Sequence, residues 1–160
     1  MAKPAADPVR VIATNRKASH DFHIHERMEA GVVLVGSEVK SLRDAKVTML
    51  DGWVEIRKGQ AYLHGIQINE YPQANRWQHD VNRVRKLLMH RHELDKLGTK
   101  TTQKGYTLIP LALYFKGSRV KAELGLVTHK KQHDKRAAKR EAEDKREIDR
   151  AVKGRLRDKA

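Results

Sequence analysis

Apolar and polar residues alternate along much of the chain, with the period of two that is typical of half-buried β-strands. The segment DFHIHERM would place Phe22, Ile24 and Met28 on one face of a strand, while histidine and charged residues would occupy the other. Residues 119–127 alternate in the same way, and a short strand is expected at 9–13. These patterns predict a mainly β protein.

Turn residues join the predicted strands into hairpins. Lys58-Gly59 separates the arms WVEIRK and AYLHGIQI, and Lys116-Gly117-Ser118 separates YTLIPLALYF from RVKAELGLV. Residues 29–31 predict a further short turn that would lead into a return strand over 32–35. Because these connections are short, the strands that they join should pair antiparallel.

Two helices and one long loop are expected between the strands. Ser37 would cap a short helix, and the pattern from His90 predicts a second helix that ends at Gly98. Residues 85–89 fit either a strand or a first helical turn. Residues 70–83 show no period and predict a long loop, and such loops inside compact domains often serve function.

Together these elements predict an OB-fold-like antiparallel barrel with short helices over residues 9–129. A β-sandwich is the alternative that the same hairpins allow. Residues 1–8 contain two prolines and small residues, and we expect them to be disordered.

The alternation ends at Lys130, and residues 130–160 differ in kind. Their large apolar residues, Ile148, Val152 and Leu156, form one thin stripe. That stripe cannot offset an ordering entropy of about 1–2 kcal/mol per residue. The segment nevertheless lacks proline and is rich in good helix formers. We therefore expect a basic tail that is disordered when free and helical when an anionic partner holds it.

The charge of the chain indicates a polyanionic partner. The formal net charge is +14, with 34 basic and 20 acidic residues. The tail holds 13 of the basic and 7 of the acidic residues, so both parts of the chain are basic. Such a balance favours binding to phosphate backbones. Basic clusters accompany the predicted strands, and Phe22, Tyr71 and Trp77 are candidates for stacking on bases.

Several classes of function find no support in the sequence. The absence of cysteine excludes disulfides, thiolate zinc sites and cysteine nucleophiles. No phosphate-binding loop, dinucleotide fingerprint or serine-nucleophile motif is present. The amino-terminal residues have no apolar core of a secretory signal, which predicts a cytoplasmic protein. His23 and His25 would project from the same strand face, so a metal-dependent nuclease is the enzymatic alternative.

Four segments resemble the SsrA-binding protein family, also called small protein B. They are GSEVKSLRDAKV at 36–47, NRWQHDVNRVRKLLMHRHEL at 75–94, GYTLIPLALYFKGSRVKAELGL at 105–126 and KKQHDKR at 130–136. The resemblance implies a non-enzymatic bacterial adaptor, without a cofactor, that binds the tRNA-like domain of transfer-messenger RNA as a monomer. It would deliver that RNA to stalled ribosomes for trans-translation. A generic OB-fold ribosomal or RNA-chaperone protein is the alternative.

The resemblance also implies which residues bind RNA. Positions that match the family's RNA contacts, or lie in its EVKSLR segment, are Asn15, Glu29, Lys40, Arg43, Leu88 and Lys121. Glu29 would orient a nearby arginine or accept a hydrogen bond from a base or ribose. In the family, a segment of the tail occupies the decoding centre and the empty mRNA channel. The positions that match it here are Lys130, Lys131, His133, Asp134, Lys135 and Arg136. There His133 would stack on a ribosomal base, while Lys135 and Arg136 would hold phosphates.

Two positions depart from the pattern of that family. His129 stands before the Lys-Lys pair where glycine is usual, and Val81 follows the His-Asp of the loop where proline is common. A glycine would give a looser hinge. The two departures therefore bear on the flexibility of the tail and on the rigidity of the loop.

Overall fold

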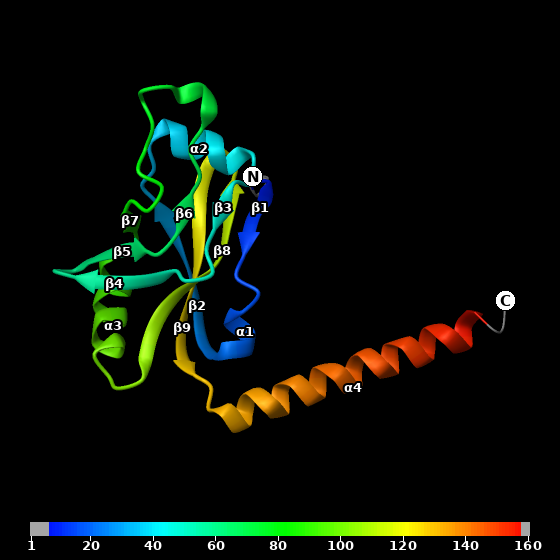
Figure 1. Ribbon diagram of the computed structural model, residues 1–160. Coiled ribbons are helices and arrows are strands. Elements are labelled where there is room, and N and C mark those ends of the chain that lie inside the picture. Colours follow the sequence, from blue (N-terminus) through cyan, green and yellow to red (C-terminus); the bar gives the residue numbers. More distant parts are fainter. Residues whose placement is uncertain (1–6, 158–160) are drawn as a thin grey trace, which may run out of the picture.

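The computed structural model describes residues 7–157 and shows a β-barrel from which one long helix projects (Figure 1). The prediction of disorder over 1–8 falls largely on residues outside that range. The elements, in chain order, are β1 (Val9–Thr14), α1 (Ala18–Asp21), β2 (Phe22–Val32), α2 (Gly36–Arg43), β3 (Val47–Thr48), β4 (Trp53–Arg57), β5 (Gln60–His64), β6 (Gln67–Ile68), the 3₁₀ turn η1 (Pro72–Ala74), β7 (Arg85–Leu88), α3 (Arg91–Thr101), β8 (Tyr106–Lys116), β9 (Arg119–His129) and α4 (Gln132–Arg157).

The main sheet closes on itself, which confirms the mainly β antiparallel barrel. Its strand order is β1-β8-β4-β5-β7-β2-β9, and an additional pairing joins β9 back to β8. Six strands thus complete the barrel, while β1 pairs with the later half of β8. Strands β3 and β6 form a separate two-stranded sheet. Because the sheet closes, the β-sandwich alternative is wrong.

The interior of the barrel is filled by aliphatic side chains from every long strand. Leu63, Leu108 and Leu124 are almost wholly buried there. Leu42 of α2 and Leu97 of α3 add to the same core. Each such leucine contributes about 1.5–3 kcal/mol by burial, so the barrel is stabilised without any side chain from α4.

Strand β2 continues through residues 29–31, where the sequence predicted a turn. Ala30 pairs with Ala122 of β9, and Gly31 pairs both with Lys121 of β9 and with Leu88 of β7. A Cβ at Gly31 would lie 3.3 Å from the Cβ of Leu88. The small residues therefore allow the strands to approach closely. Of the predicted return strand over 32–35, only Val32 is in a strand, as the last residue of β2.

The structure differs from the sequence prediction at two other glycines. Gly65, at φ +70°, separates β5 from β6 inside the predicted arm AYLHGIQI, and a Cβ there would lie 2.4 Å from the carbonyl oxygen of Asp51. Gly98 lies inside α3, which continues to Thr101. The chain reverses instead at Gly105, at φ +90°.

The other local predictions were mixed. The turns at Lys58-Gly59 and at 116–118 are present, residues 70–83 form a loop that contains η1, and 85–88 are a strand. Ser37 is not the cap of α2, because Val35 precedes the helix and its N–H donates to Glu38 at 3.0 Å.

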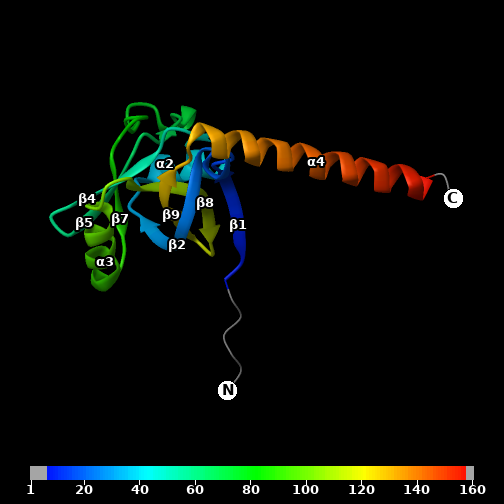
Figure 2. The same cartoon turned by 90° about the horizontal axis from the view of Figure 1, so that it is seen from below.

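Within the tail, Gln132–Arg157 form the single helix α4, which extends away from the barrel in both views (Figures 1 and 2). Its helical form agrees with the conformation expected on a partner, and disorder in the free protein stays a prediction. Among residues 7–157, no helix is long and apolar enough to cross a membrane.

Candidate nucleic-acid interface

Three of the residues expected to bind RNA meet at one shallow hollow of about 540 Å³. Glu29, Leu88 and Lys121 line it from three neighbouring strands. The register explains the convergence, because Gly31 lies opposite both Leu88 and Lys121. We call this surface the Glu29 hollow; its other lining residues are Arg27, Met28, Gly31, Met89, His90 and Glu93.

The carboxylate of Glu29 is held by two side chains of β8. The Tyr114 hydroxyl donates a hydrogen bond to Glu29, and Lys116 Nζ lies 3.2 Å from Glu29 Oε1. The Tyr114 hydrogen bond is the main reason why the pKa of Glu29 lies below its ordinary value, and the charge of Lys121 lowers that pKa further. Burial and the adjacent carboxylate raise the pKa of Tyr114. Glu29 therefore stays ionised at neutral pH.

No hydrogen bond or ion pair joins an arginine to Glu29 within the described residues, so the expected role of orienting an arginine finds no support here. Arg27 Nη1 instead lies 3.5 Å from Glu123 on the adjacent strand. What Glu29 orients is the hydroxyl of Tyr114 and the ammonium group of Lys116. The sequence does not reveal either partner, because only the pairing of β8 with β9 and of β9 with β2 brings them to Glu29.

The hollow combines the exposed side chain of Leu88 with cationic side chains. Leu88 is 55% exposed although it belongs to a strand of the barrel. His90 precedes α3 and stacks on His92, with ring centroids 5.7 Å apart. An exposed leucine beside lysine, arginine and histidine offers contacts to both the faces of bases and the phosphates of RNA.

Asn15 does not belong to this hollow. It follows β1, its N–H donates to Leu111 O at 2.7 Å, and its Nδ2 donates to Pro110 O at 3.2 Å. It is only 7% exposed. Asn15 instead lines a different hollow, together with Asp21 and Phe22 at the α1 end of β2.

Lys40 and Arg43 form a separate basic patch on α2. Lys40 Nζ lies 5.6 Å from the centre of the Tyr71 ring. The Arg10 guanidinium donates to the carbonyl oxygen of Arg43 and lies over the ring of Phe115. Both α2 residues are exposed, so the patch can meet a phosphate backbone without rearrangement.

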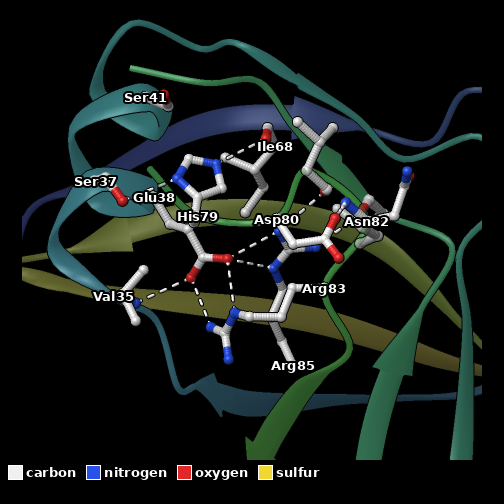
Figure 3. Close-up of polar contacts among 12 residues, drawn as sticks. Val35, Ser37, Glu38, Ser41, Ile68, His79, Asp80, Asn82, Arg83 and Arg85 are labelled. Carbon is white, nitrogen blue, oxygen red and sulfur yellow. Dashed lines mark hydrogen bonds and ion pairs between the residues drawn. The ribbon is translucent and has the colours of Figure 1, made fainter. Parts of the chain in front are cut away.

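Residues 83–86 contain three basic side chains in the sequence, and two of them, Arg83 and Arg85, turn toward the buried Glu38 (Figure 3). Glu38 is fully buried and accepts hydrogen bonds from Arg83 Nη2 at 2.7 Å and from Arg85 Nε at 3.0 Å. Burial acts to raise the pKa of Glu38, but the hydrogen bonds from Arg83 and from the Val35 N–H outweigh it and lower that pKa. Arg85, also buried, donates to Ile66 O at 2.7 Å. This cluster positions α2 against the loop.

The same cluster fixes the loop 70–83. His79 is buried, with Nδ1 2.9 Å from Ser37 Oγ and Nε2 2.9 Å from Ile68 O (Figure 3). Val81 O accepts hydrogen bonds from Ile68 N and Arg85 Nη2. A proline would keep that carbonyl, so Val81 leaves the anchoring intact. Trp77, at the tip of the loop, is 76% exposed beneath the Arg76 guanidinium.

The tail begins with a set of contacts to the barrel. Lys130 N–H donates to Asp21 O at 2.9 Å, and Lys130 Nζ donates to Ser19 O at 2.8 Å. Lys135 Nζ lies 3.4 Å from Asp21, and Asp134 lies 3.6 Å from His23 Nε2. The remaining residues of the predicted decoding segment, Lys131, His133 and Arg136, are exposed.

His129 ends β9 and does not act as a hinge. It pairs with Phe22 across β2 and β9, and their ring centroids are 4.3 Å apart. The break between strand and helix falls at Lys130 and Lys131. His129 is therefore part of the strand pairing in this chain, and the connection to α4 consists of Lys130 and Lys131.

The histidine pair expected for a metal-dependent nuclease is engaged by the protein itself. His25 Nε2 lies 2.8 Å from Thr128 Oγ1, and His23 faces Asp134. Among residues 7–157, no group of three or more metal-ligating side chains lies close enough to hold an ion.

Comparison with known proteins places these features in a family. A protein-family model with the description "SmpB protein" matches residues 12–154. The SsrA-binding protein of Streptomyces avermitilis is 50% identical over 89% of this chain and 81% of its own length. That of Geobacillus thermodenitrificans is 47% identical over 91% of this chain and 94% of its own. A solved structure described as "tmRNA-SmpB: a journey to the center of the bacterial ribosome" aligns with a TM-score of 0.64 at 43% identity, and the alignment covers 75% of this chain and 85% of that chain.

Proposed function

The chain belongs to the SmpB protein family, and from that membership we propose that it is the RNA-binding adaptor of trans-translation. It binds the tRNA-like domain of transfer-messenger RNA and delivers that RNA to ribosomes stalled in the bacterial cytoplasm. It does so without catalysing a reaction and as a monomer bound one-to-one to the RNA. The SsrA-binding proteins similar to it and the tmRNA-SmpB structure support this proposal.

The single observation that carries the RNA-binding part is the Glu29 hollow. Glu29, Leu88 and Lys121 are separated by up to 92 positions in the sequence and nevertheless line one surface. Ionised Glu29 holds the Lys116 ammonium in place while Lys121 approaches from the neighbouring strand. A fixed array of this kind binds a shaped RNA backbone with less loss of side-chain entropy than mobile lysines would.

The tail supplies a second binding surface. The helix α4 carries charged side chains around its whole circumference and offers Ile148 and Val152 as exposed apolar residues. It therefore fits a channel walled by RNA better than it fits the surface of its own barrel. We propose that residues from Lys130 to Arg136 occupy the decoding centre and that the rest of α4 follows the empty mRNA channel.

Competition binding separates this function from that of a generic RNA chaperone. The purified chain is titrated with labelled transfer-messenger RNA at fixed salt, with an elongator tRNA or unrelated structured RNA as competitor. We expect the competitors to bind at least about tenfold more weakly, because shape-specific contacts add to the phosphate term. Equal affinity for all the RNAs would contradict the proposal and favour the generic protein.

A further inference from the structure

A second hollow lies at the other end of β2, where α1, β9 and the loop before β4 meet. Its volume is about 350 Å³, within the usual range for sites that take small ligands. The lining residues that matter are Asn15, Asp21, Phe22, Asp51, Trp53 and His129. We call it the Asp51 hollow. It shares no residue with the Glu29 hollow.

Aromatic pairs border this hollow on two sides. The ring centroids of Phe22 and His129 are 4.3 Å apart. Trp53 stacks on His64 with centroids also 4.3 Å apart and an interplanar angle of 10°, and His64 is held by Glu55 at 3.0 Å. Trp53 is 45% exposed. Its indole is therefore oriented before a ligand arrives, as a stacking platform requires.

Three residues of the lining, Asn15, Asp21 and Asp51, carry side-chain acceptors. Asp51 and Asp21 contribute carboxylates, and the Asp51 residue is exposed at the rim. Asn15 is 93% buried, its Nδ2 donates to Pro110 O, and its Oδ1 has no hydrogen-bond partner among the described residues. Leaving a buried acceptor unpaired costs about 1–3 kcal/mol, so such a group marks a place where a ligand can donate.

The chemistry of this hollow differs from that of the rest of the surface. Its carboxylates repel a phosphate, although the chain as a whole carries +14. The Asp21 carboxylate already has Lys135 and His20 as ion-pair partners. A flat ligand with N–H donors could therefore donate hydrogen bonds to the Asp51 carboxylate. Nucleobases that carry an exocyclic amino group have those donors on one edge and a π-face for Trp53. Uracil has no amino group.

We propose that the Asp51 hollow is a nucleobase site that binds an amino-bearing base, guanine above all, stacked on Trp53 with its N1–H and amino group donating to Asp51. This inference rests on the proposed function, because it adds a pocket for one unstacked base to the RNA contacts proposed for the Glu29 hollow and the tail. The base is one that RNA presents outside a duplex.

Nucleosides test the site because they carry no phosphate. Saturation-transfer NMR on the full chain measures binding of guanosine, inosine and uridine at millimolar concentration. We expect guanosine to bind at least about fivefold more tightly than inosine or uridine, since a bidentate base contact gives discrimination of that order. Equal binding of the three nucleosides, or no binding of guanosine, would overturn the proposal.

Substitutions identify the residues. Asp51→Asn should reduce guanosine binding at least about fivefold, whereas Asp44→Asn, an equal change of charge at an exposed residue, should not. Unchanged guanosine binding by Asp51→Asn would contradict the assignment of Asp51. Trp53→Ala should abolish guanosine binding and Trp53→Phe should restore most of it, and circular dichroism checks that each variant is folded.

The result of the nucleoside experiments does not depend on whether transfer-messenger RNA is the partner. Failure of the proposed function would appear as equal affinity for transfer-messenger RNA and competitor tRNA in the titration described above. Failure of the base site would appear as absent guanosine selectivity, even where transfer-messenger RNA binds tightly and selectively through the Glu29 hollow.

Discussion

The Lys135 ammonium lies 3.4 Å from the Asp21 carboxylate, and this contact ties the first turn of α4 to α1. Both side chains are about one-third exposed, and an ion pair of that kind contributes about 0–1 kcal/mol at most. The contact orients the start of α4 but does not hold the rest of the helix against the barrel. Beyond it, none of the described side chains of α4, up to Gly154, belongs to the core of the barrel.

We therefore predict that the tail is largely unfolded in the free protein and becomes helical on a polyanion. The circular dichroism of a chain that ends at His129, subtracted from that of the full chain, isolates the contribution of the tail. That difference should show little helix in buffer and a clear helical signal with a polyanion, because phosphates neutralise its repelling cations. A full helical signal in buffer alone would show that the tail is already ordered.

The chain that ends at His129 should also separate RNA binding from ribosome rescue. Its core is complete without α4, so its midpoint of thermal unfolding should fall by only a few degrees and its binding of transfer-messenger RNA should persist. Tagging of stalled chains in a reconstituted translation system should be lost. Tagging at the rate of the full chain would mean that residues 130–160 have no part in rescue.

Substituting Glu38 tests the buried cluster. Glu38→Gln leaves Arg85 buried without a counter-charge, so the free energy of unfolding should fall by about 3–5 kcal/mol. Glu123→Gln, which breaks the exposed contact with Arg27, should change it by less than about 1 kcal/mol. Urea denaturation measures both. A loss below 1 kcal/mol for Glu38→Gln would contradict the structural role of the cluster.

The same carboxylate predicts a pH dependence. The pKa of Glu38 in the folded protein lies below its ordinary value of 4.5, so its stabilising effect is fully present above that value. This contribution should be lost as the pH falls below 4.5 and through the folded-state pKa, because the unfolded chain binds the proton more readily. Glu38→Gln should therefore unfold with a shallower pH dependence below 4.5.

Removing the Tyr114 hydroxyl should remove a hydrogen bond that stabilises the ionised form of Glu29. The hydrogen bond from Tyr114 is the main reason why the pKa of Glu29 is lowered, so Tyr114→Phe should raise that pKa toward its ordinary value. An NMR titration of the side-chain carboxyl carbon measures the shift. Tyr62→Phe, a change on β5 outside the Glu29 hollow, serves as the control and should leave the pKa of Glu29 unchanged.

Local patterns predicted those parts of the fold whose causes are local. The alternation from Phe22 to Met28 and the turn residues at Lys58-Gly59 specify a strand and a hairpin by themselves. Glycine was less informative, because its role depends on distant neighbours. Gly31 admits the side chain of Leu88, and Gly65 admits the carbonyl of Asp51.

The candidate site was predictable only in part. Resemblance to a family supplied Glu29, Leu88 and Lys121, whereas no periodicity in the sequence relates them. Tyr114 and Lys116 escaped notice because their contact with Glu29 requires the pairing of β8 with β9 and of β9 with β2. The interior position of Arg85 was likewise hidden, since a basic cluster in sequence looks the same whether it faces solvent or a buried carboxylate.

The most direct test of the account is the salt dependence of RNA binding by Lys121→Ala. The affinity for transfer-messenger RNA is measured at several salt concentrations for the original chain, for Lys121→Ala and for Lys104→Ala, an exposed lysine outside the Glu29 hollow. We predict that Lys121→Ala weakens binding and reduces the slope of log affinity against log salt by about one, while Lys104→Ala leaves both nearly unchanged. An unaltered slope and affinity for Lys121→Ala would show that the Glu29 hollow does not hold the RNA backbone.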